Sequence, residues 1–425
     1  MGDLHVKYLL VGGGVAAYSA AVAIRERDRR GDLLLVGQEI NRPYDRTQLS
    51  KAFLRRTVPR SQLFACEPDW YRDQNIQLRT GRRAVHLDPN RRVVTLDDGQ
   101  AVAYDRLLLA TGAVARPLAI PGGQAPGVHL FRTIEDAERL HTAIDKAHHD
   151  GRKHLGGRGK AVVIGAGLLG VEVAAALAAA ELRVDLIARH KHPWPKLVGE
   201  TTGSFLSHYL AAHGLHLHQE TGAQRIDGDG RAQRVVLDNG QSLECDFVVA
   251  AIGAVANKDL LRGTSISAEQ AILADEHCRT SVADIFAAGD CAAVRDTIFN
   301  RHRVPEQWDT AAATGTVAGA NMAGAAARFE TVTSLATDVF GLNVRAWGQS
   351  KHLARRLIRG SPNVEAPDFL EIGVAADGRI SQILAVGHGG EYARLEKIVR
   401  SRCSINGYEE QLKDPAFALE QLVKT

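Results

Sequence analysis

The stretch VVIGAGLLGVE, residues 162–172, has the pattern of a buried strand that turns through glycines into a helix. Gly165, Gly167 and Gly170 occupy the three positions of the G-x-G-x-x-G fingerprint. The first glycine permits the tight turn, the second lets a pyrophosphate approach the backbone, and the third lets helix and strand pack closely. The phosphates then lie at the helix N-terminus, where free N–H groups and the helix dipole favour an anion. The stretch therefore predicts a dinucleotide-binding unit.

The same pattern occurs near the start of the chain, in KYLLVGGGVAAYSAAVAI, residues 7–24. Gly12, Gly14 and Ala17 take the corresponding three positions. One such motif is weak evidence, because glycine-rich turns are common, but two in a strand–turn–helix context are much stronger. Together they predict an α/β protein in which two Rossmann-like domains bind two dinucleotides.

Turn residues predict three hairpins, at Asp98-Gly99, Asn239-Gly240 and Asp377-Gly378. Apolar strands are expected at 106–110 and within 235–256, and IFAAGDCAAV, 285–294, reads as another strand that ends in Gly-Asp. The glycine-rich punctuation thins in the last hundred or so residues, which predicts a third, C-terminal domain of α+β type. Amphipathic helices are expected after the last hairpin.

The composition is that of a globular protein, with 45% hydrophobic and 24% charged residues. The net charge of +3 argues against a general nucleic-acid binder. Residues 1–100 nevertheless hold 17 Lys and Arg against 12 Asp and Glu, much of the excess at 55–60, 79–83 and 91–92. These arginines are either a solvated face or a docking surface for an acidic partner.

The cysteines are scattered, and none forms a C-x-x-C pair. We therefore expect neither a redox-active pair close in sequence nor a metal cluster. We expect a reducing, cytoplasmic location. The apolar N-terminal stretch is interrupted by glycines where a strand–turn–helix is expected, so we interpret it as structure and not as a signal peptide. No membrane span is predicted. The five cysteines of the chain are Cys66, Cys245, Cys278, Cys291 and Cys403.

Several motifs occur in a telling order: the first fingerprint, RPYDRTQLSK, LLLATGA, the second fingerprint, IFAAGDCA and PEQWDTAAATG. In this order they resemble the two-dinucleotide flavoprotein reductases of the glutathione-reductase-like fold. The chain is most similar to the branch with ferredoxin reductases, rubredoxin reductases and apoptosis-inducing-factor-like proteins. The resemblance is good from residue 6 to about residue 350 and loose beyond.

The resemblance implies that FAD binds the first fingerprint and a nicotinamide nucleotide binds the second. It also implies a discontinuous FAD domain, 1–118 with 246–325. The nicotinamide-nucleotide domain would then be 119–245, and the C-terminal α+β domain 326–425.

The resemblance implies a catalytic pair, Lys51 with Glu172, beside the reactive part of the flavin. A reduced flavin carries negative charge that a cation stabilises, and a buried lysine needs a carboxylate partner. The resemblance implies that Asp290 hydrogen-bonds the ribityl–phosphate arm; it could also be a helix N-cap, and the two roles are compatible. Trp308 either lines the flavin ring or is a core aromatic. The remaining residues expected to contact cofactors are Arg46, Ala110, Thr111, Gly112, Arg116, Leu168, Leu169, Ala251, Ile252, Gly253, Gly289, Glu306 and Gln307.

Two departures from the family pattern stand out. The segment VGQE leaves Gln38 or Glu39 to hold the FAD ribose, where an acidic residue is usual. In SLATDVFG, Leu335 and Ala336 replace an aromatic pair that the family often has. The mouth of the active site is then less aromatic, which bears on the electron acceptor.

Three functions fit the resemblance. The first is an NAD(P)H oxidoreductase that passes electrons through FAD to a small redox protein, such as an acidic ferredoxin or a rubredoxin, as a monomer or homodimer. The second is a disulfide reductase, but the usual segment has no cysteine, Cys66 has no partner nearby in sequence, and only His388 and Glu391 offer an acid–base pair. The third is an apoptosis-inducing-factor-like oxidase or redox-responsive scaffold.

The strand after the second fingerprint, VDLIA, ends in Arg189, His190 and Lys191. A carboxylate at this place would accept the 2′-hydroxyl of NAD and repel the 2′-phosphate of NADP. Here Ala188 stands in that position, and the cations follow it. Arginine presents a planar fork to phosphate oxygens. The pattern predicts a preference for NADPH over NADH, with Arg189 as the main determinant and His190 as the second; the alternative is an exposed polar loop.

Overall fold

The structure is a computed structural model that describes residues 4–153, 157–304, 306–387 and 392–423. The chain forms two compact units, each discontinuous in sequence. Unit 1 comprises Met1–Asp45, Arg60–Val114 and Ala254–Thr333, and unit 2 comprises Arg46–Pro59, Ala115–Gly253 and Ser334–Thr425. These units partition the chain differently from the three domains predicted above, and that division stays a prediction.

Unit 1 is built on a seven-stranded sheet in the order β3-β2-β1-β6-β5-β4, with β18 pairing β6. The pairs β1–β2, β2–β3, β1–β6 and β6–β18 are parallel, and β4–β5 and β5–β6 are antiparallel. The hairpin predicted at Asp98-Gly99 is confirmed, because it joins β5 to β6. The strands are β1 (Leu4–Val11), β2 (Leu33–Val36), β3 (Ile76–Arg79), β4 (Ala84–Asp88), β5 (Val93–Leu96), β6 (Ala101–Leu109) and β18 (Ile285–Ala287).

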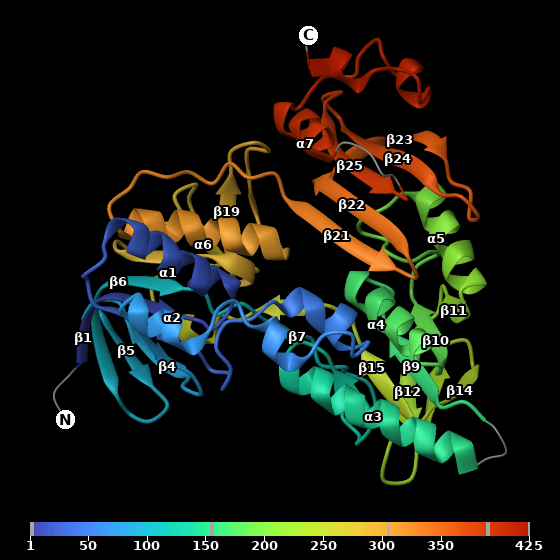
Figure 1. Ribbon diagram of the computed structural model, residues 1–425, viewed down its shortest axis with the longest axis horizontal. Helices are drawn as coiled ribbons and strands as arrows, with labels where there is room; N and C mark the ends of the chain where they lie inside the picture. Colours follow the sequence, from blue (N-terminus) through green and yellow to red (C-terminus); the bar gives the residue numbers. More distant parts are fainter. Residues whose placement is uncertain (1–3, 154–156, 305, 388–391, 424–425) are drawn as a thin grey trace. The chain divides into compact units, whose positions relative to one another are not determined.

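Helices α1 (Val15–Arg27) and α6 (Trp308–Met322) lie side by side over this sheet (Figure 1). Their backbones approach closely through glycines: a Cβ atom on Gly315 would overlap the carbonyl oxygen of Ala16, and one on Gly319 would overlap that of Ala20. Glycine is therefore required at both places. Unit 1 also holds α2 (Pro68–Asp73) and a small sheet of β17 (Ile272–Ala274), β19 (Ala292–Asp296) and β20 (Arg301–Arg303).

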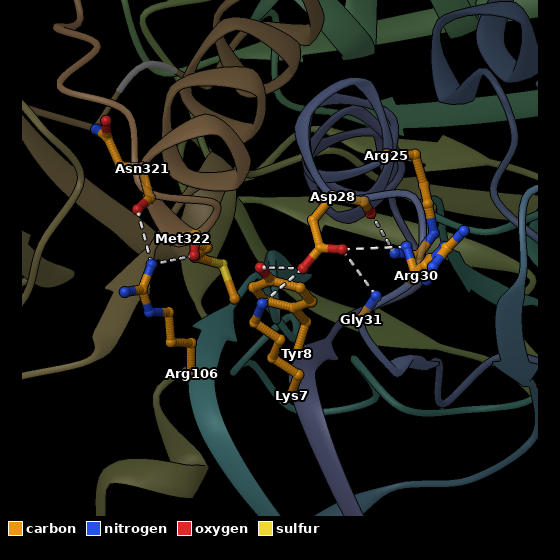
Figure 2. A network of polar contacts seen from close by, with 9 residues as sticks. All are labelled: Lys7, Tyr8, Arg25, Asp28, Arg30, Gly31, Arg106, Asn321 and Met322. Carbon is orange, nitrogen blue, oxygen red and sulfur yellow. Dashed lines mark hydrogen bonds and ion pairs between the residues drawn. The ribbon is translucent and has the colours of Figure 1, made fainter.

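A polar network closes the turn between α1 and β2 (Figure 2). The Asp28 carboxylate accepts hydrogen bonds from Lys7 Nζ at 2.6 Å and from the Tyr8 hydroxyl at 3.0 Å. It also accepts the backbone N–H groups of Arg30 and Gly31, at 3.0 and 2.8 Å. These four bonds fix the end of α1 and the start of the next strand.

Unit 2 holds a five-stranded parallel sheet in the order β11-β10-β9-β15-β8. Its strands are β8 (Val128–Leu130), β9 (Lys160–Ile164), β10 (Arg183–Ala188), β11 (Leu215–Gln219) and β15 (Phe247–Ala250). Its helices are α3 (Ile134–Lys153), α4 (Leu168–Ala179) and α5 (Glu200–Ala212). The hairpin predicted at Asn239-Gly240 is confirmed in the antiparallel sheet of β12 (Ala223–Asp227), β13 (Arg234–Leu237) and β14 (Ser242–Glu244).

A second large sheet of unit 2, antiparallel in the order β21-β22-β25-β24-β23, carries helix α7 (Tyr392–Ser401) (Figure 1). The hairpin predicted at Asp377-Gly378 is confirmed, because it joins β24 to β25. The sheet and helix also confirm the α+β character expected here. The strands are β21 (Ser334–Val339), β22 (Leu342–Gly348), β23 (Leu353–Ser361), β24 (Asp368–Ala375) and β25 (Ile380–Val386).

Short elements complete the chain. The strands β7 (Ala113–Ala115) and β16 (Ala254–Ala256) lie where the chain passes from one unit to the other. The short helices are η1 (Arg46–Gln48), η2 (Leu49–Phe53), η3 (Arg60–Leu63), η4 (Asp259–Leu261), η5 (Gly289–Cys291), η6 (Gln411–Lys413) and η7 (Leu419–Val423). Within the described ranges, no helix combines the length and apolarity needed to cross a bilayer.

Candidate cofactor and active site

The first fingerprint forms the tight turn that its glycines predict. Gly12 has φ +144°, and a Cβ atom there would overlap the Ala110 carbonyl oxygen. Gly14 is the N-cap of α1, and no atom of the described chain lies within 4 Å of the place where its Cβ would be. Ala17 is fully buried where the helix meets the sheet. The open side of Gly14 and the uncapped amides of α1 fit a pyrophosphate.

The second fingerprint repeats this arrangement in unit 2. Gly165 has φ +109°, and its Cβ would overlap the Ala251 carbonyl oxygen. Gly167, the N-cap of α4, is open to at least 4 Å among the described residues. A Cβ on Gly170 would overlap the Gly165 carbonyl oxygen, so the helix packs directly on the turn. Leu168 and Leu169 open the helix, and Ala251, Ile252 and Gly253 follow the neighbouring strand β15. Each unit therefore offers one cradle for a dinucleotide.

Beside the first cradle, Gln38 is exposed, and Glu39 accepts a hydrogen bond of 2.7 Å from the Tyr44 hydroxyl. Thr111 donates to the Asn257 carbonyl at 2.7 Å, and Gly112 has φ +67° with open space around it. Which of Gln38 and Glu39 holds a ribose stays a prediction. Glu39 is the one already oriented by a partner.

Asp290 lies within the short helix η5 and is partly exposed. The N-cap of that helix is Ala288, so the prediction that Asp290 is an N-cap is wrong and its ligand role stays a prediction. Gly289 precedes it with φ +75°, a conformation that glycine adopts without strain. The Cys291 thiol is fully buried, and burial raises its pKa, so it stays protonated and unreactive.

Glu306, Gln307 and Trp308 lead into α6, with Gln307 as its N-cap. The Trp308 side chain is 42% exposed, so the alternative that it is a core aromatic is wrong. An exposed tryptophan at a helix start offers a flat apolar surface to a ligand.

Unit 2 brings Lys51 and Glu172 together, as the resemblance implies. The Lys51 ammonium lies 3.6 Å from a Glu172 carboxylate oxygen, and the Glu172 side chain is only 7% exposed. Glu172 comes from α4, two residues past the second fingerprint, and Lys51 from η2. The pair therefore couples a segment near the N-terminus to the helix that opens the second cradle.

Sequence reasoning missed the other partners of this pair. Ser50 donates a hydrogen bond of 2.5 Å to one Glu172 oxygen, and Thr337 donates one of 2.6 Å to the other. Lys51 also donates to the Ala336 carbonyl at 2.8 Å. The only signal in the sequence was the position of Ser50 directly before the lysine. The carboxylate is thus held in place by three groups.

Two predicted cofactor residues make backbone contacts within unit 2. Arg46 donates a hydrogen bond from Nη1 to the Arg132 carbonyl at 3.0 Å. The Arg116 backbone N–H donates to the Gly253 carbonyl at 2.9 Å. These contacts order the two segments, and the roles of both residues toward a cofactor stay predictions.

The cations after β10 are exposed, as a nucleotide contact requires. Arg189 has an acidic neighbour that the sequence did not reveal: a Cβ on Gly222 would lie 2.9 Å from Arg189 Nε and 3.2 Å from an Asp238 oxygen. Thr221 and the Gly222 N–H donate to this carboxylate at 2.5 and 3.0 Å. These bonds, and to a lesser degree the charge of Arg189, lower the pKa of Asp238. Part of the positive charge at this site is therefore balanced.

The basic segments are exposed, but many of their arginines have carboxylate partners. The pairs are Arg56–Asp145 at 2.8 Å, Arg82–Asp98 at 3.0 Å, Arg83–Asp259 at 3.0 Å and Arg92–Asp284 at 2.6 Å. The excess charge seen in the sequence is therefore partly neutralised in the fold.

Within the described ranges, nothing further supports the alternative of a disulfide reductase. All five cysteines are free thiols. His388 and Glu391, the proposed acid–base pair, lie outside the described residues. Among the residues that the structure does describe, no cluster of three or more His, Cys, Asp or Glu side chains could hold a metal ion.

The chain was compared with known proteins. It is 36% identical over 286 residues to rhodocoxin reductase of Rhodococcus erythropolis, a match that covers 67% of this chain and 64% of that protein. It is 28% identical over 417 residues, 98% of both chains, to the biphenyl dioxygenase system ferredoxin–NAD(+) reductase component of Paraburkholderia xenovorans. Among solved structures, putidaredoxin reductase in its covalent complex with putidaredoxin has a TM-score of 0.90 at 27% identity, covering 99% of both chains.

The model of the pyridine nucleotide-disulphide oxidoreductase family matches residues 6–315. That range includes both fingerprints, Lys51, Glu172 and Asp290. The family match and the similarity to the solved reductase confirm the predicted class of fold, with two dinucleotide-binding Rossmann-like domains. The chain therefore belongs to the pyridine nucleotide-disulphide oxidoreductase family and is an FAD-dependent NAD(P)H oxidoreductase.

Proposed function

We propose that the protein takes a hydride from NADPH, in preference to NADH, and passes the electrons through FAD to a small redox protein of the ferredoxin type. The observation that carries this proposal is the pair of matching cradles, one in each unit, together with the Lys51–Glu172 pair beside the second. Bound FAD can receive two electrons as a hydride and release them one at a time.

The residues of the chain have separable tasks in this proposal. The open faces of Gly14 and Gly167 receive the two pyrophosphates at helix N-termini. Lys51 supplies a positive charge, and Glu172, fixed by Ser50 and Thr337, keeps that lysine in place. Lys51 thereby stabilises the negative charge that develops on the cofactor. Trp308, in unit 1, offers its exposed ring to the dinucleotide bound in that unit.

The preference for NADPH rests on Ala188 and Arg189. The end of β10 carries no carboxylate that would repel a 2′-phosphate, and Arg189 can donate to it. Since Asp238 lies near Arg189, we expect a preference of about tenfold in kcat/KM, the equivalent of ~1.4 kcal/mol. The measurement is kcat/KM for NADPH and NADH in the wild type and in the Ala188→Glu, Arg189→Ala double variant.

The double variant should reverse the preference, whereas Lys196→Ala, an exposed cation in the same segment, should not change it. A wild type that prefers NADH, as the name of the biphenyl dioxygenase relative indicates for that protein, would contradict the proposal. A double variant that still prefers NADPH would show that Arg189 faces solvent.

The electron acceptor is proposed from the relatives. They are named for rhodocoxin, for a ferredoxin and for putidaredoxin, all small carriers, and one of them was solved covalently joined to its carrier. The exposed arginines Arg82, Arg83, Arg91 and Arg92 suit an acidic carrier. The test is steady-state turnover with NADPH against a [2Fe–2S] ferredoxin, a rubredoxin, a quinone and ferricyanide, at increasing ionic strength.

We expect the ferredoxin to be reduced fastest, with a rate that falls as salt shortens the reach of charge to about 10 Å at about 0.1 M. The fall should be moderate, because several of the arginines are already paired. Faster reduction of the quinone, or a ferredoxin rate indifferent to salt, would favour a small neutral acceptor. Slow turnover with every acceptor would favour the redox-responsive scaffold.

A further inference from the structure

The segment after β10, residues 189–199, joins the proposed 2′-phosphate cations to the start of α5 without regular secondary structure. Its first half is tied to the parallel sheet. Gln219 donates to the Lys191 carbonyl at 2.7 Å, and the Trp194 N–H donates at 2.8 Å to the carbonyl of Ala166, inside the second fingerprint. The cations and the phosphate cradle therefore share one backbone framework.

The second half of the segment is tied to the antiparallel sheet. Arg356 on β23 donates to the Leu197 carbonyl at 3.1 Å. Glu371 on β24 accepts the Gly199 N–H with both carboxylate oxygens, at 3.0 and 3.1 Å. The Trp194 carbonyl accepts the N–H groups of Leu197 and Val198, at 2.8 and 3.1 Å. Contacts thus run unbroken from Glu371 to the fingerprint turn.

Arg356 and Glu371 form an ion pair in which the carboxylate is buried and the arginine is 21% exposed, and Gln382 on β25 accepts a further hydrogen bond of 3.1 Å from Arg356. The Glu371 residue is 0% exposed. A buried carboxylate with every partner fixed cannot change position without leaving a charge uncompensated. A Cβ on Gly199 would lie 2.6 Å from Arg356 Cδ, so the backbone rests directly on the arginine side chain.

Helix α5 connects the Arg356–Glu371 pair to the cations that follow β10. Gly199 is its N-cap, and the negative charge of Glu371 suits the positive end of the helix dipole. One turn later, a Cβ on Gly203 would overlap the imidazole of His192, so the ring packs on bare helix backbone. The start of α5 therefore fixes His192, the next residue after Lys191.

We propose that Glu371 and Arg356 are positioning residues for the nicotinamide nucleotide: they set the geometry of residues 189–199 and so the affinity for the phosphorylated adenosine ribose. This inference rests on the proposed function of Arg189. A displacement of about 1 Å far from the chemistry is enough to weaken a fitted site severalfold or more. Cofactor choice is then governed partly from a sheet that need not touch the nucleotide.

The test uses the FAD-loaded enzyme with Glu371→Gln, Glu371→Ala and Arg356→Lys. Glu409→Gln is the matched control, because it removes the partner of Arg355, the neighbour of Arg356 on the same strand. The readouts are calorimetric binding of 2′,5′-ADP, KM and kcat for NADPH and NADH, the flavin absorption spectrum and the melting temperature.

We expect the Kd of 2′,5′-ADP and the KM of NADPH to rise about tenfold in Glu371→Ala, and less in Glu371→Gln, which keeps an acceptor for the Gly199 N–H. The kcat at saturating NADPH and the flavin spectrum should not change. A lower melting temperature with unchanged Kd and KM would overturn the proposal, because that is the result of a purely structural role. If Glu371→Ala does not fold, Glu371→Gln and Arg356→Lys decide between these outcomes.

Arg189→Ala separates this inference from the function on which it rests. If Arg189→Ala weakens 2′,5′-ADP binding but the Glu371 and Arg356 variants do not, only the positioning role is wrong. If Arg189→Ala leaves that binding unchanged, the proposed cofactor site is wrong and the positioning role is overturned with it.

Discussion

The ammonium group of Lys51 lies close to two acceptors in unit 2, a Glu172 oxygen at 3.6 Å and the Ala336 carbonyl at 2.8 Å. The hydroxyl groups of Ser50 and Thr337 donate hydrogen bonds to the same carboxylate. The lysine is 21% exposed, so one side of its charge is accessible while the other is held. A fixed, partly accessible cation is suited to stabilise a negative charge that appears only during a reaction.

We expect Lys51→Met to slow flavin reduction by NAD(P)H about tenfold or more, since each ~1.4 kcal/mol of lost transition-state stabilisation is a factor of ten. The measurement is stopped-flow bleaching of the flavin absorbance, with the flavin midpoint potential as a second readout. Lys160→Met is the control, because it breaks the surface pair with Glu244, 2.5 Å apart in the same unit. An unchanged rate and potential in Lys51→Met would remove the pair from the reaction.

At the scale of elements, the α1–β2 turn depends on one carboxylate (Figure 2). The hydrogen bond from Lys7, together with those from the Gly31 and Arg30 N–H groups and Tyr8, holds the pKa of Asp28 well below its usual range. A group whose pKa is lowered by folding contributes stability that is present above its unfolded pKa. That contribution is lost as the pH falls through the folded value.

Asp28→Asn should therefore lower the free energy of unfolding by about 1.5–3 kcal/mol at neutral pH, the range for hydrogen bonds to charged groups. The difference from the wild type should shrink below about pH 4, near the unfolded pKa of an aspartate. Urea unfolding at neutral and acid pH measures both, with Asp73→Asn, an exposed partner of Arg72, as the control. A difference that persists undiminished at acid pH would assign the effect to shape and not to charge.

At the scale of the whole molecule, glycine patterns predicted the fold because the local backbone conformation at these positions requires glycine. Gly12 and Gly165 must take a positive φ and lie against a neighbouring strand, and no other residue does so without strain. Turn pairs such as Asn239-Gly240 also depend only on local backbone conformation, and they predicted the hairpins correctly. The Lys51–Glu172 contact was predictable only through the family resemblance, since nothing in the spacing brings the two together.

The partners that sequence reasoning missed are those set by tertiary packing. Serine and threonine are common, so nothing marked Thr337 as a neighbour of Glu172. Asp238 reaches Arg189 from a hairpin of another sheet, which no periodicity reveals. The buried Glu371 lies in the strand before the hairpin turn predicted at Asp377-Gly378, and that prediction said nothing of its ion-pair partner. The partners of buried charges are determined by tertiary packing, which the sequence pattern does not reveal.

The discontinuity of both units has a consequence for how the protein is made. Strand β1 is translated long before β18, Ile285–Ala287, and their sheet is complete only when β18 has been translated. Helix α6, which covers α1 through Gly315 and Gly319, follows later still. The first part of unit 1 therefore remains an unfinished sheet while residues of unit 2 are synthesised. Unpaired strand edges and exposed apolar surface of this kind make a nascent chain prone to aggregate.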